Sequence, residues 1–187
     1  LLQRYGKMKL YKILVKNNYK VFRGSENNVL KRYCDCATKF SIYNILRITG
    51  DNPLVDPNLV DKVVDIYQKK NFDYISNIEK RTFPKGLDIE VFSHKALQQA
   101  YLKTNSKFDK EHVTPYLRRN FSKRYNYVSK EDFSSIRITL DTIHDHILIK
   151  KIYYKFGNKI FYYKDIISFY KKNKKIFKQT VINNSFI

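Results

Sequence analysis

The sequence predicts an α/β fold, in which strands and helices alternate along the chain and form an open sheet covered by helices. Short apolar runs of strand length recur along the chain, and several are followed by a segment whose apolar residues have helical spacing. Polar loops separate these segments, and some of the loops end in residues suited to cap a helix. A length of 187 residues leaves room for one domain with a full core, and we expect residues 1–187 to form one.

The first elements are expected to be a helix, a strand and a second helix. Residues 10–14 carry apolar side chains at helical spacing, and residues 19–22 form a short apolar run that we interpret as a strand. A polar turn over residues 24–28 separates this run from a helical pattern over residues 29–37. Residues 44–49 form a run of strand length that contains Ile45, Leu46 and Ile48, and they are predicted to be the next strand.

A further helix is predicted to begin at Pro57. Asp56 suits the N-cap position, and proline suits the first helical position because it has no N–H group to leave unpaired. A short strand over residues 73–76 follows this helix. Strands joined by helices in this way predict parallel strands connected by crossovers, and therefore an α/β sheet.

The alternation of strands and helices relaxes in the second half of the chain. After a loop over residues 81–86, a strand is expected over residues 87–92. Ser93 then suits the N-cap of a helix. Another helix is expected over residues 109–120, with Pro115 inside it.

The last predicted elements are a strand and a helix. Residues 135–140 alternate between polar and apolar side chains like a half-buried strand. Thr142 and Asp145 have the spacing of a capping box, which is typical of a helix start, and this helix is expected to reach about Phe156.

The chain is strongly basic, with 37 Lys and Arg residues against 17 Asp and Glu residues and a formal net charge of +20. This balance favours a polyanionic partner such as nucleic acid or a membrane surface. Between residues 147 and 180, however, the lysines alternate with Ile, Phe and Tyr, as they do on the solvated face of ordinary helices. We therefore interpret the charge as solvated surface and expect neither nucleic acid nor membrane as a partner.

The sequence also indicates where the protein resides. It has no stretch of about 18 apolar residues free of charge, and its N-terminal residues lack the apolar block of a signal peptide. We therefore expect a soluble, cytoplasmic protein. Cys34 and Cys36 are its two cysteines, and without a second pair they predict neither a metal site nor a disulfide framework.

Two aspartates stand at the ends of predicted strands, where open α/β sheets bind their ligands. Asp51 follows the strand over residues 44–49, and Asp141 follows the strand over residues 135–140. If these strands are neighbours, the two carboxylates can share one Mg²⁺ ion, which takes a couple of carboxylates and fills its other positions with water and phosphate oxygens. Helix capping is the alternative role for each aspartate.

Two other groups of residues are candidates for binding. The loop from Arg23 to Glu26 offers hydrogen-bonding groups beside a glycine that permits close backbone approach, although a surface turn is the alternative. His112, Arg118 and Arg119 fall in the helix expected over residues 109–120, where guanidinium groups can receive a carboxylate or phosphate. Solvated charge is the alternative there.

Several ordered strings carry a resemblance to a known family. They are, in chain order, VFRGSENNVLKRY, ILRITGDNPLVDPNLVD, DYISN, RTFPKGLDIEVFS, EHVTPYLRR and RITLDTIHD. Together they resemble the cytidylyltransferase family that includes spore coat polysaccharide biosynthesis protein F, which is related to the CMP-Kdo and acylneuraminate cytidylyltransferases. The resemblance runs from about residue 10 to the end of the chain.

This resemblance implies a Rossmann-like nucleotide-diphospho-sugar transferase fold with a mixed, mostly parallel sheet between helices. It also implies transfer of CMP from CTP to a sugar or sugar acid, with release of pyrophosphate, Mg²⁺ as the cofactor, and a possible homodimer. Asp51 and Asp141 match the catalytic, metal-binding acids of the family. Arg23, Gly24, Ser25 and Glu26 match the nucleotide-binding segment that lines the cytosine pocket. The substrate-binding positions on the sugar side are Asn77, Arg81, Asp88, Glu90, His112, Arg118 and Arg119.

The sequence departs from the family pattern at its N-terminus. Members of the family begin with a strand and a Gly-rich loop that grips the triphosphate, and this chain begins with Leu1, after that point. We therefore expect an N-terminally truncated domain that lacks the first strand and the Gly-rich loop, and a fragment that is inactive by itself.

Two other functions are alternatives to a cytidylyltransferase. A glycosyltransferase of the same fold would use a nucleotide sugar, but such enzymes usually carry an Asp-x-Asp motif, and Asp51 is followed by Asn52 and Pro53. A basic nucleic-acid-binding protein would use the charge and the 13 Phe and 16 Tyr residues.

Overall fold

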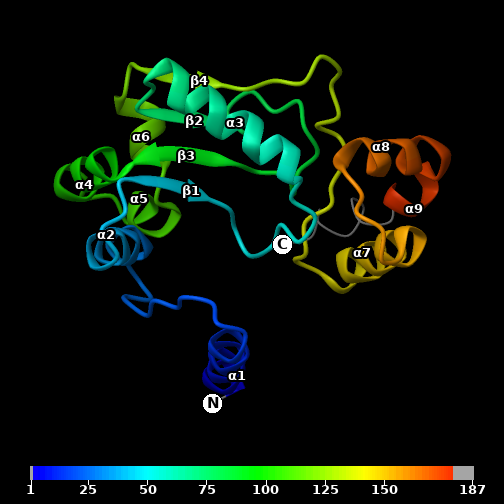
Figure 1. Cartoon of the computed structure of the whole chain (residues 1–187), viewed down its shortest axis with the longest axis horizontal. Coiled ribbons are helices and arrows are strands. Elements are labelled where there is room, and N and C mark those ends of the chain that lie inside the picture. Colours follow the sequence, from blue (N-terminus) through cyan, green and yellow to red (C-terminus); the bar gives the residue numbers. More distant parts are fainter. Residues whose placement is uncertain (1, 179–187) are drawn as a thin grey trace.

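The computed structural model describes the backbone of residues 2–178 and the side chains of residues 9–177 (Figure 1). Its elements are, in chain order, α1 (Leu2–Lys16), α2 (Val29–Lys39), β1 (Asn44–Arg47), α3 (Pro57–Lys70), β2 (Tyr74–Ser76), β3 (Glu90–Ser93), α4 (His94–Lys103), α5 (Lys107–His112), α6 (Pro115–Asn120), β4 (Arg124–Asn126), α7 (Ile143–Phe156), α8 (Tyr163–Lys172) and α9 (Lys174–Lys178). The predicted α/β class is therefore confirmed.

The sheet has four strands in the order β1-β3-β2-β4. β3 pairs antiparallel with both β1 and β2, whereas β2 and β4 pair in parallel. β1, β2 and β4 consequently run in one direction and β3 runs in the other. The sheet is mixed, as the resemblance implies, but two of its three pairings are antiparallel, because β3 lies between the two strands that α3 connects.

Helices cover both faces of the sheet (Figure 1). On one face, side chains of α3 and of the inner strands form a buried cluster that includes Val63, Ile75 and Val91. On the other face, Tyr74 and Phe92 pack against buried side chains from α2, α4 and α6. Because successive strand residues point to opposite faces, β2 and β3 contribute alternate residues to both clusters.

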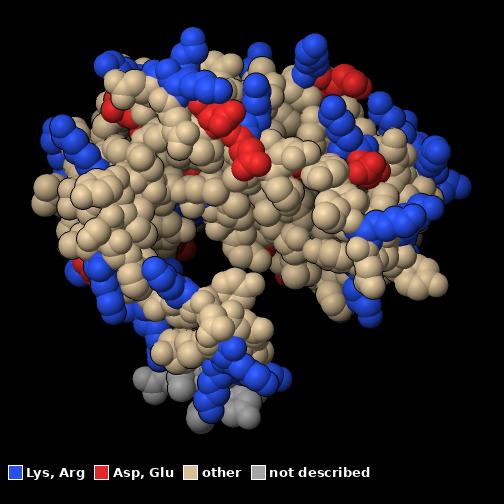
Figure 2. Space-filling model, in the orientation of Figure 1, with Lys and Arg blue, Asp and Glu red and all other residues tan. Residues whose placement is uncertain are grey.

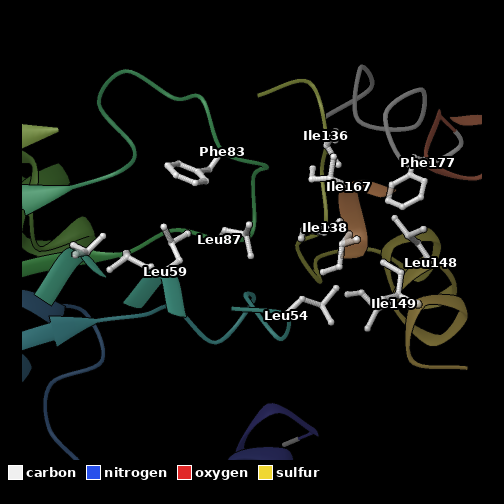
Figure 3. Packing of buried hydrophobic residues seen from close by; sticks show 14 of the residues in the cluster. Leu54, Leu59, Phe83, Leu87, Ile136, Ile138, Leu148, Ile149, Ile167 and Phe177 are labelled. Carbon is white, nitrogen blue, oxygen red and sulfur yellow. The ribbon is translucent and has the colours of Figure 1, made fainter. Parts of the chain in front are cut away.

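The first of these clusters continues beyond the sheet toward α7, α8 and α9 (Figure 3). Residues 133–140, which we call the strap, lie between the two parts. Ile136 and Ile138 of the strap are buried between Phe83 and Leu87 on the sheet side and residues such as Leu148 of α7. The strap therefore joins the C-terminal helices to the sheet through an apolar core.

The sequence predicts a strand over residues 135–140, which lie in the strap. This prediction is wrong, because the strap forms a single bridge rather than a strand of the sheet. The strap makes an isolated parallel bridge between Lys85 and Arg137. The Lys85 N–H donates to the Ile136 carbonyl at 2.8 Å, and the Ile138 N–H donates to the Lys85 carbonyl at 2.8 Å. The strap is extended, but its partner is a short loop segment, and the loop does not continue alongside it to make a longer ladder.

Other predicted elements differ in their bounds. Residues 19–22 are not a strand, because no strand among the described residues pairs with them. Phe22 instead packs edge-on to the Phe40 ring, with the ring centroids 6.5 Å apart. The helix expected over residues 109–120 is split into α5 and α6. Pro115 cannot donate to the preceding turn, so it begins a new helix after Val113, whose φ is 73°.

The predicted helix starts are confirmed. Asp56 caps α3 by accepting from the Leu59 N–H at 3.0 Å, and Ser93 caps α4 by accepting from the Ala96 N–H. The second carboxylate oxygen of Asp56 accepts from the Tyr163 N–H at 2.7 Å. Asp56 therefore also fixes the start of α8 against the sheet.

Lys and Arg side chains are spread around the visible face of the molecule rather than gathered in one patch (Figure 2). Individual lysines, such as Lys31 and Lys171, pair with neighbouring acids at the surface. This distribution is typical of a solvated surface. None of the helices in the described part of the chain has both the length and the apolar character needed to cross a membrane.

Gly86 is the tightest point between the loop and the strap, and its replacement tests their packing. Its φ is +112°, and an added Cβ would lie 2.8 Å from the Ile138 carbonyl carbon. We expect Gly86→Ala to destabilise the protein by about 2 to 4 kcal/mol, through backbone strain and overpacking together. Urea denaturation followed by circular dichroism measures this change.

The matched control is Gly50→Ala, because an added Cβ at Gly50 meets nothing within 4 Å. It should change the free energy of unfolding by less than about 0.5 kcal/mol. Equal stabilities for the two variants would show that the strap is not held closely against the loop.

Candidate active site

The loops that carry Asp51 and Asp141 are joined by a backbone hydrogen bond. The Leu140 N–H donates to the Asp51 carbonyl at 2.8 Å, so the end of the strap lies beside the loop that follows β1. The Tyr153 hydroxyl of α7 donates to the Pro53 carbonyl at 3.0 Å and ties the same loop to the next helix. Two segments far apart in the sequence are thereby brought together at the edge of the sheet, between β1 and α7 (Figure 1).

Asp51 lies in a tight turn at this edge. The Asn52 N–H donates to the Thr49 carbonyl at 3.1 Å, which reverses the chain directly after β1. Asp51 itself is half-buried, whereas Asn52 beside it is buried. Asp51 does not cap α3, because Asp56 does so. Helix capping, the alternative role for Asp51, is thus excluded for that helix.

Asp141 lies just before α7, and its position is fixed by Asp145. The buried Asp145 carboxylate accepts from the Asp141 N–H at 3.0 Å and from the Thr142 N–H at 2.9 Å. The Thr142 hydroxyl accepts from the Asp145 N–H at 3.2 Å and completes the predicted capping box. Because Thr142 is the N-cap, Asp141 precedes the helix and its side chain does not cap α7.

Arg137 of the strap connects the two acids Asp141 and Asp145. Its Nη2 lies 3.1 Å from Asp145 Oδ2 and also pairs with Asp141 Oδ2. Burial alone would raise the pKa of Asp145, but the hydrogen bonds from Arg137 and from the Asp141 and Thr142 N–H groups outweigh burial and lower it. Asp145 is therefore a charged, structural carboxylate, whereas the Asp141 side chain is 46% exposed.

The residues at this edge suit a hard divalent cation. Asp51 and Asp141 offer carboxylate oxygens, the donors that Mg²⁺ prefers. Nearby, Asn52 Nδ2 and Thr139 Oγ1 are buried without a hydrogen-bond partner among the described residues, which is typical of a polar site completed by a ligand or water. The described residues contain no group of three or more His, Cys, Asp or Glu side chains that could hold a metal ion, so a site here would have at most two such ligands from these residues.

Arg23, Gly24 and Glu26 line a pocket beside α1. The cavity volume is about 360 Å³, and its walls include Tyr11, Phe22 and Arg32. Figure 2 shows the molecule deeply hollowed between α1 and the sheet. Arg23 and Gly24 lie at the surface of this pocket, and the Arg23 guanidinium carbon lies 5.8 Å from the centroid of the Tyr11 ring.

Ser25 also has a structural role in this segment. Its hydroxyl oxygen accepts from the Asn28 N–H at 3.1 Å, and its carbonyl accepts from Arg32 at 2.9 Å. Asn28 in turn caps α2 by accepting from the Lys31 N–H. The segment is therefore held in shape by the start of α2.

The predicted sugar-side residues Asn77, Arg81 and Asp88 make close contacts within the protein. The buried Asn77 amide donates to the Leu87 carbonyl at 2.6 Å and accepts from the Ile89 N–H at 2.9 Å. Arg81 and Asp88 form a two-bond ion pair at 2.6 and 2.9 Å. Asn77 therefore supports the chain around residue 88, whereas the Arg81 and Asp88 side chains stay about one-quarter exposed.

Glu90 lies in a buried polar network on the face of the sheet toward α2 and α4. Its carboxylate accepts from the Tyr74 hydroxyl at 2.6 Å and pairs with Arg47 on β1. Burial and the neighbouring carboxylate raise the pKa of Tyr74, so the phenol keeps its proton. The Arg47 Nε and the Ser76 hydroxyl are buried in this region without a hydrogen-bond partner among the described residues.

His112, Arg118 and Arg119 do not share one helix as predicted. His112 ends α5, where its ring lies 4.4 Å from that of Phe108. Arg119 of α6 pairs with the buried Asp109 at 2.7 Å. Burial raises the pKa of Tyr74, and the positive charge of the half-buried Arg118 on α6 opposes this rise, so Arg118 is within electrostatic range of the Glu90 network.

Sequence reasoning missed three residues of this region. The capping-box spacing identifies Asp145 as a helix cap, but nothing in the sequence indicates that it holds Arg137. Arg47 ends β1 directly across from Glu90, a register that follows from the antiparallel pairing with β3. The alternation of polar and apolar residues shows which side of its strand Arg47 or Glu90 occupies, but it does not show which two strands are neighbours.

Comparisons with known proteins give matches over most of the chain. The sequence pattern that defines the cytidylyltransferase family matches residues 13–184. An uncharacterised protein of Methanocaldococcus jannaschii is 39% identical over 163 residues, which cover 83% of this chain and 65% of that protein. Spore coat polysaccharide biosynthesis protein SpsF of Bacillus subtilis is 33% identical over 155 residues, which cover 78% of this chain and 61% of SpsF.

A solved structure shares the fold. The structure of a cytidylyltransferase from Leptospira borgpetersenii matches with a TM-score of 0.85 and 37% sequence identity, over 90% of this chain and 73% of that one. This match confirms the nucleotidyltransferase-type, Rossmann-like fold. The chain spans a little under two thirds of the length of each of the two relatives, 65% and 61%.

The role assigned to Asp145 leads to a pH-dependent prediction. Because its pKa is lowered in the folded protein, its contribution to stability is fully present above the ordinary aspartate pKa of about 4 and is lost as pH falls through the lowered value. We expect Asp145→Asn to reduce the free energy of unfolding by about 2 to 4 kcal/mol at neutral pH, and this difference from wild type to shrink below about pH 4. Urea denaturation across this pH range measures it.

The matched control is Asp165→Asn. Asp165 accepts from the Tyr162 N–H at 2.8 Å at the start of α8, but it is exposed. Its loss should cost only about 1 kcal/mol. An Asp145→Asn effect that is no larger, or that does not change with pH, would contradict the structural role of Asp145.

Proposed function

This chain belongs to the cytidylyltransferase family, and we propose that it serves in the transfer of CMP from CTP to a sugar or sugar acid with release of pyrophosphate, in surface polysaccharide or glycan biosynthesis. Because residues 1–187 by themselves are expected to be inactive, binding of CTP is the property to test on this chain. The proposal rests above all on the hydrogen bond that holds the Asp51 and Asp141 segments together at one edge. In this proposal the two carboxylates bind Mg²⁺, and the triphosphate of CTP supplies further oxygens to the ion.

The reaction joins the α-phosphate of CTP to a sugar hydroxyl while the bond to pyrophosphate breaks. Such transfers depend on in-line positioning and on neutralising the charge of the phosphates. A bound Mg²⁺ ion supplies that neutralisation and promotes ionisation of the attacking hydroxyl. The task of Asp51 and Asp141 is to hold the ion in place, and the task of the surrounding loops is to orient the two substrates.

The pocket beside α1 is the proposed site for the cytosine base. Its walls combine apolar side chains with Arg23 and Glu26, which suits a flat base that also carries donors and acceptors at its edge. An added Cβ at Gly24 would lie 3.0 Å from the side chains of Arg32 and Phe22, so a glycine here lets these two walls of the pocket pack closely. Ser25 contributes through the shape of the segment.

The proposed sugar side lies around the Glu90 network. Arg81, Asp88 and Arg118 keep polar groups partly exposed, so they are the proposed direct contacts. Asn77, Glu90 and Arg119 support these contacts through their hydrogen bonds and ion pairs. His112 lies at the surface, and we propose that it contacts the sugar at the outer rim of the sugar site.

Family membership favours this function over the two alternatives. A glycosyltransferase would share the sheet but would belong to another family. A nucleic-acid-binding protein would need a continuous basic surface, whereas the lysines in Figure 2 are dispersed. A two-acid site at the edge of the sheet also has no role in that alternative.

Replacing either aspartate tests the proposed metal site. We expect Asp51→Asn and Asp141→Asn each to weaken Mg²⁺-dependent CTP binding, and to reduce pyrophosphate release by about 100-fold or more wherever release is measurable, because an amide is a poor replacement for a carboxylate ligand. Isothermal titration with CTP, with and without Mg²⁺, is the primary measurement, since it does not require turnover.

Asp61→Asn is the control for this test, since Asp61 is an exposed acid on α3, away from the loops of the site. It should bind CTP like the wild type. Unchanged Mg²⁺-dependent binding in both Asp51→Asn and Asp141→Asn would refute the metal assignment.

A second variant tests the base pocket separately. We expect Arg23→Ala to raise the dissociation constant for CTP by about 10-fold, the effect of losing one charge-assisted contact of roughly 1.4 kcal/mol, and to leave Mn²⁺ binding unchanged. Lys20→Ala removes a nearby positive charge that lies over the Phe40 ring and serves as the control. If both variants weaken CTP binding equally, the effect is one of general charge rather than of the pocket.

A further inference from the structure

One guanidinium group of the candidate active site is shared between two carboxylates of different character. Arg137 Nη2 pairs with Asp141 Oδ2, and it also lies 3.1 Å from Asp145 Oδ2. The Arg137 Nε adds a longer bond of 3.4 Å to Asp145 Oδ1. The side chain of Arg137 is 13% exposed, so its charge needs a partner within the protein.

The two carboxylates hold Arg137 in different ways. Asp145 is 1% exposed and is locked by the capping box and by the N–H groups of Asp141 and Thr142. Asp141 is 46% exposed, and only its backbone N–H is tied to that box. The Asp145 carboxylate is therefore held in place by backbone N–H groups, whereas the Asp141 carboxylate is accessible to solvent and to a second cation.

We propose that Arg137 is an internal counter-cation for Asp141: it pairs with this carboxylate until a divalent cation binds, and Asp145 keeps the guanidinium in place when Asp141 turns to the cation. The inference rests on the proposed metal site at Asp51 and Asp141. It makes Arg137 a positioning residue of that site, and it gives the buried Asp145 the role of holding Arg137 in place.

Replacing Arg137 by a divalent cation at Asp141 should cost little free energy. A buried guanidinium that lost its carboxylate would be strongly destabilising, but Arg137 retains two contacts to Asp145 after Asp141 leaves. Before the cation binds, Arg137 also offsets the negative charge of two neighbouring acids, which would otherwise disfavour the folded loops. The consequence is that a metal ion must compete with Arg137 for Asp141.

Removing Arg137 should therefore tighten metal binding, the opposite of what the loss of a merely structural residue would do. We expect Arg137→Gln to lower the dissociation constant for Mn²⁺ by on the order of five-fold, because a partly exposed ion pair contributes up to about 1 kcal/mol. Titration with Mn²⁺ alone, followed by the electron paramagnetic resonance signal of the free ion, measures this change without requiring turnover.

Asp145→Asn should act in the opposite direction. Without the Asp145 charge, Arg137 has Asp141 as its remaining carboxylate partner and should hold it more firmly, so Mn²⁺ binding weakens several-fold. The double variant Arg137→Gln/Asp145→Asn removes the buried charge pair together and should recover tight binding. It also covers the case in which Arg137→Gln alone leaves Asp145 uncompensated and fails to fold, which thermal denaturation detects.

Two controls distinguish a specific counter-cation from a general effect of positive charge. Arg124 of β4 pairs at the surface with Glu79, with Arg124 Nε 3.9 Å from Glu79 Oε2. Arg124→Gln removes this positive charge and should leave Mn²⁺ binding unchanged. In a chain that already carries Asp141→Asn, adding Arg137→Gln should no longer change the dissociation constant for Mn²⁺. The difference between wild type and Arg137→Gln should also shrink as ionic strength rises from about 20 mM to about 0.5 M.

Each outcome decides between the two proposals. If wild type binds Mn²⁺ through Asp141 but both Arg137→Gln and the double variant bind equally well or more weakly, Arg137 is only a structural link and the counter-cation proposal is overturned. If wild type binds no Mn²⁺, or Asp141→Asn binds it normally, the proposed metal site itself fails and this inference fails with it.

Discussion

The hydrogen bond from the Leu140 N–H to the Asp51 carbonyl is the contact on which the candidate active site depends. It joins the loop that follows β1 to the end of the strap, and it brings the segments of two solvent-accessible acids together at the edge of the sheet. Both partners are held from behind. Asp56 and Tyr153 fix the loop, and the packing of Ile136 and Ile138 against the core fixes the strap.

The buried aspartates differ from the two proposed metal-binding aspartates in what their carboxylates contact. Asp56, Asp109 and Asp145 are buried, and each is occupied by backbone N–H groups, a hydroxyl or an arginine. Asp51 and Asp141 stay accessible to solvent, next to loops that buried acids hold in place. Under the proposed function, buried carboxylates fix the backbone, and the two accessible carboxylates are left for the cation.

Much of the fold could be predicted from the sequence, since its signals are local. The N-caps Asp56 and Ser93 and the capping box at Thr142 mark three helix starts correctly. Strand pairing depends on contacts between distant segments, so the reversed direction of β3 and the short β4 could not be inferred from periodicity. For the same reason, residues 19–22 have a strand-like composition, but no strand in the described part of the chain pairs with them.

The candidate site shows the same contrast. The positions of Asp51 and Asp141 after apolar runs point to a shared edge, and the resemblance to cytidylyltransferases reinforces this expectation. The sequence does not indicate that Asn77 and Arg119 are occupied within the protein, or that Arg137 lies between two acids. Such pairings depend on side chains meeting across the tertiary structure.

The central claim is that Asp51 and Asp141 bind one divalent cation together. A crystal structure of the chain with Mn²⁺ and CTP tests it most directly, because the anomalous scattering of manganese locates the ion independently of the protein atoms. We predict a single ion in contact with carboxylate oxygens of both residues and with phosphate oxygens of CTP. An ion bound elsewhere, or carboxylates that face away from a correctly bound nucleotide, would contradict this claim.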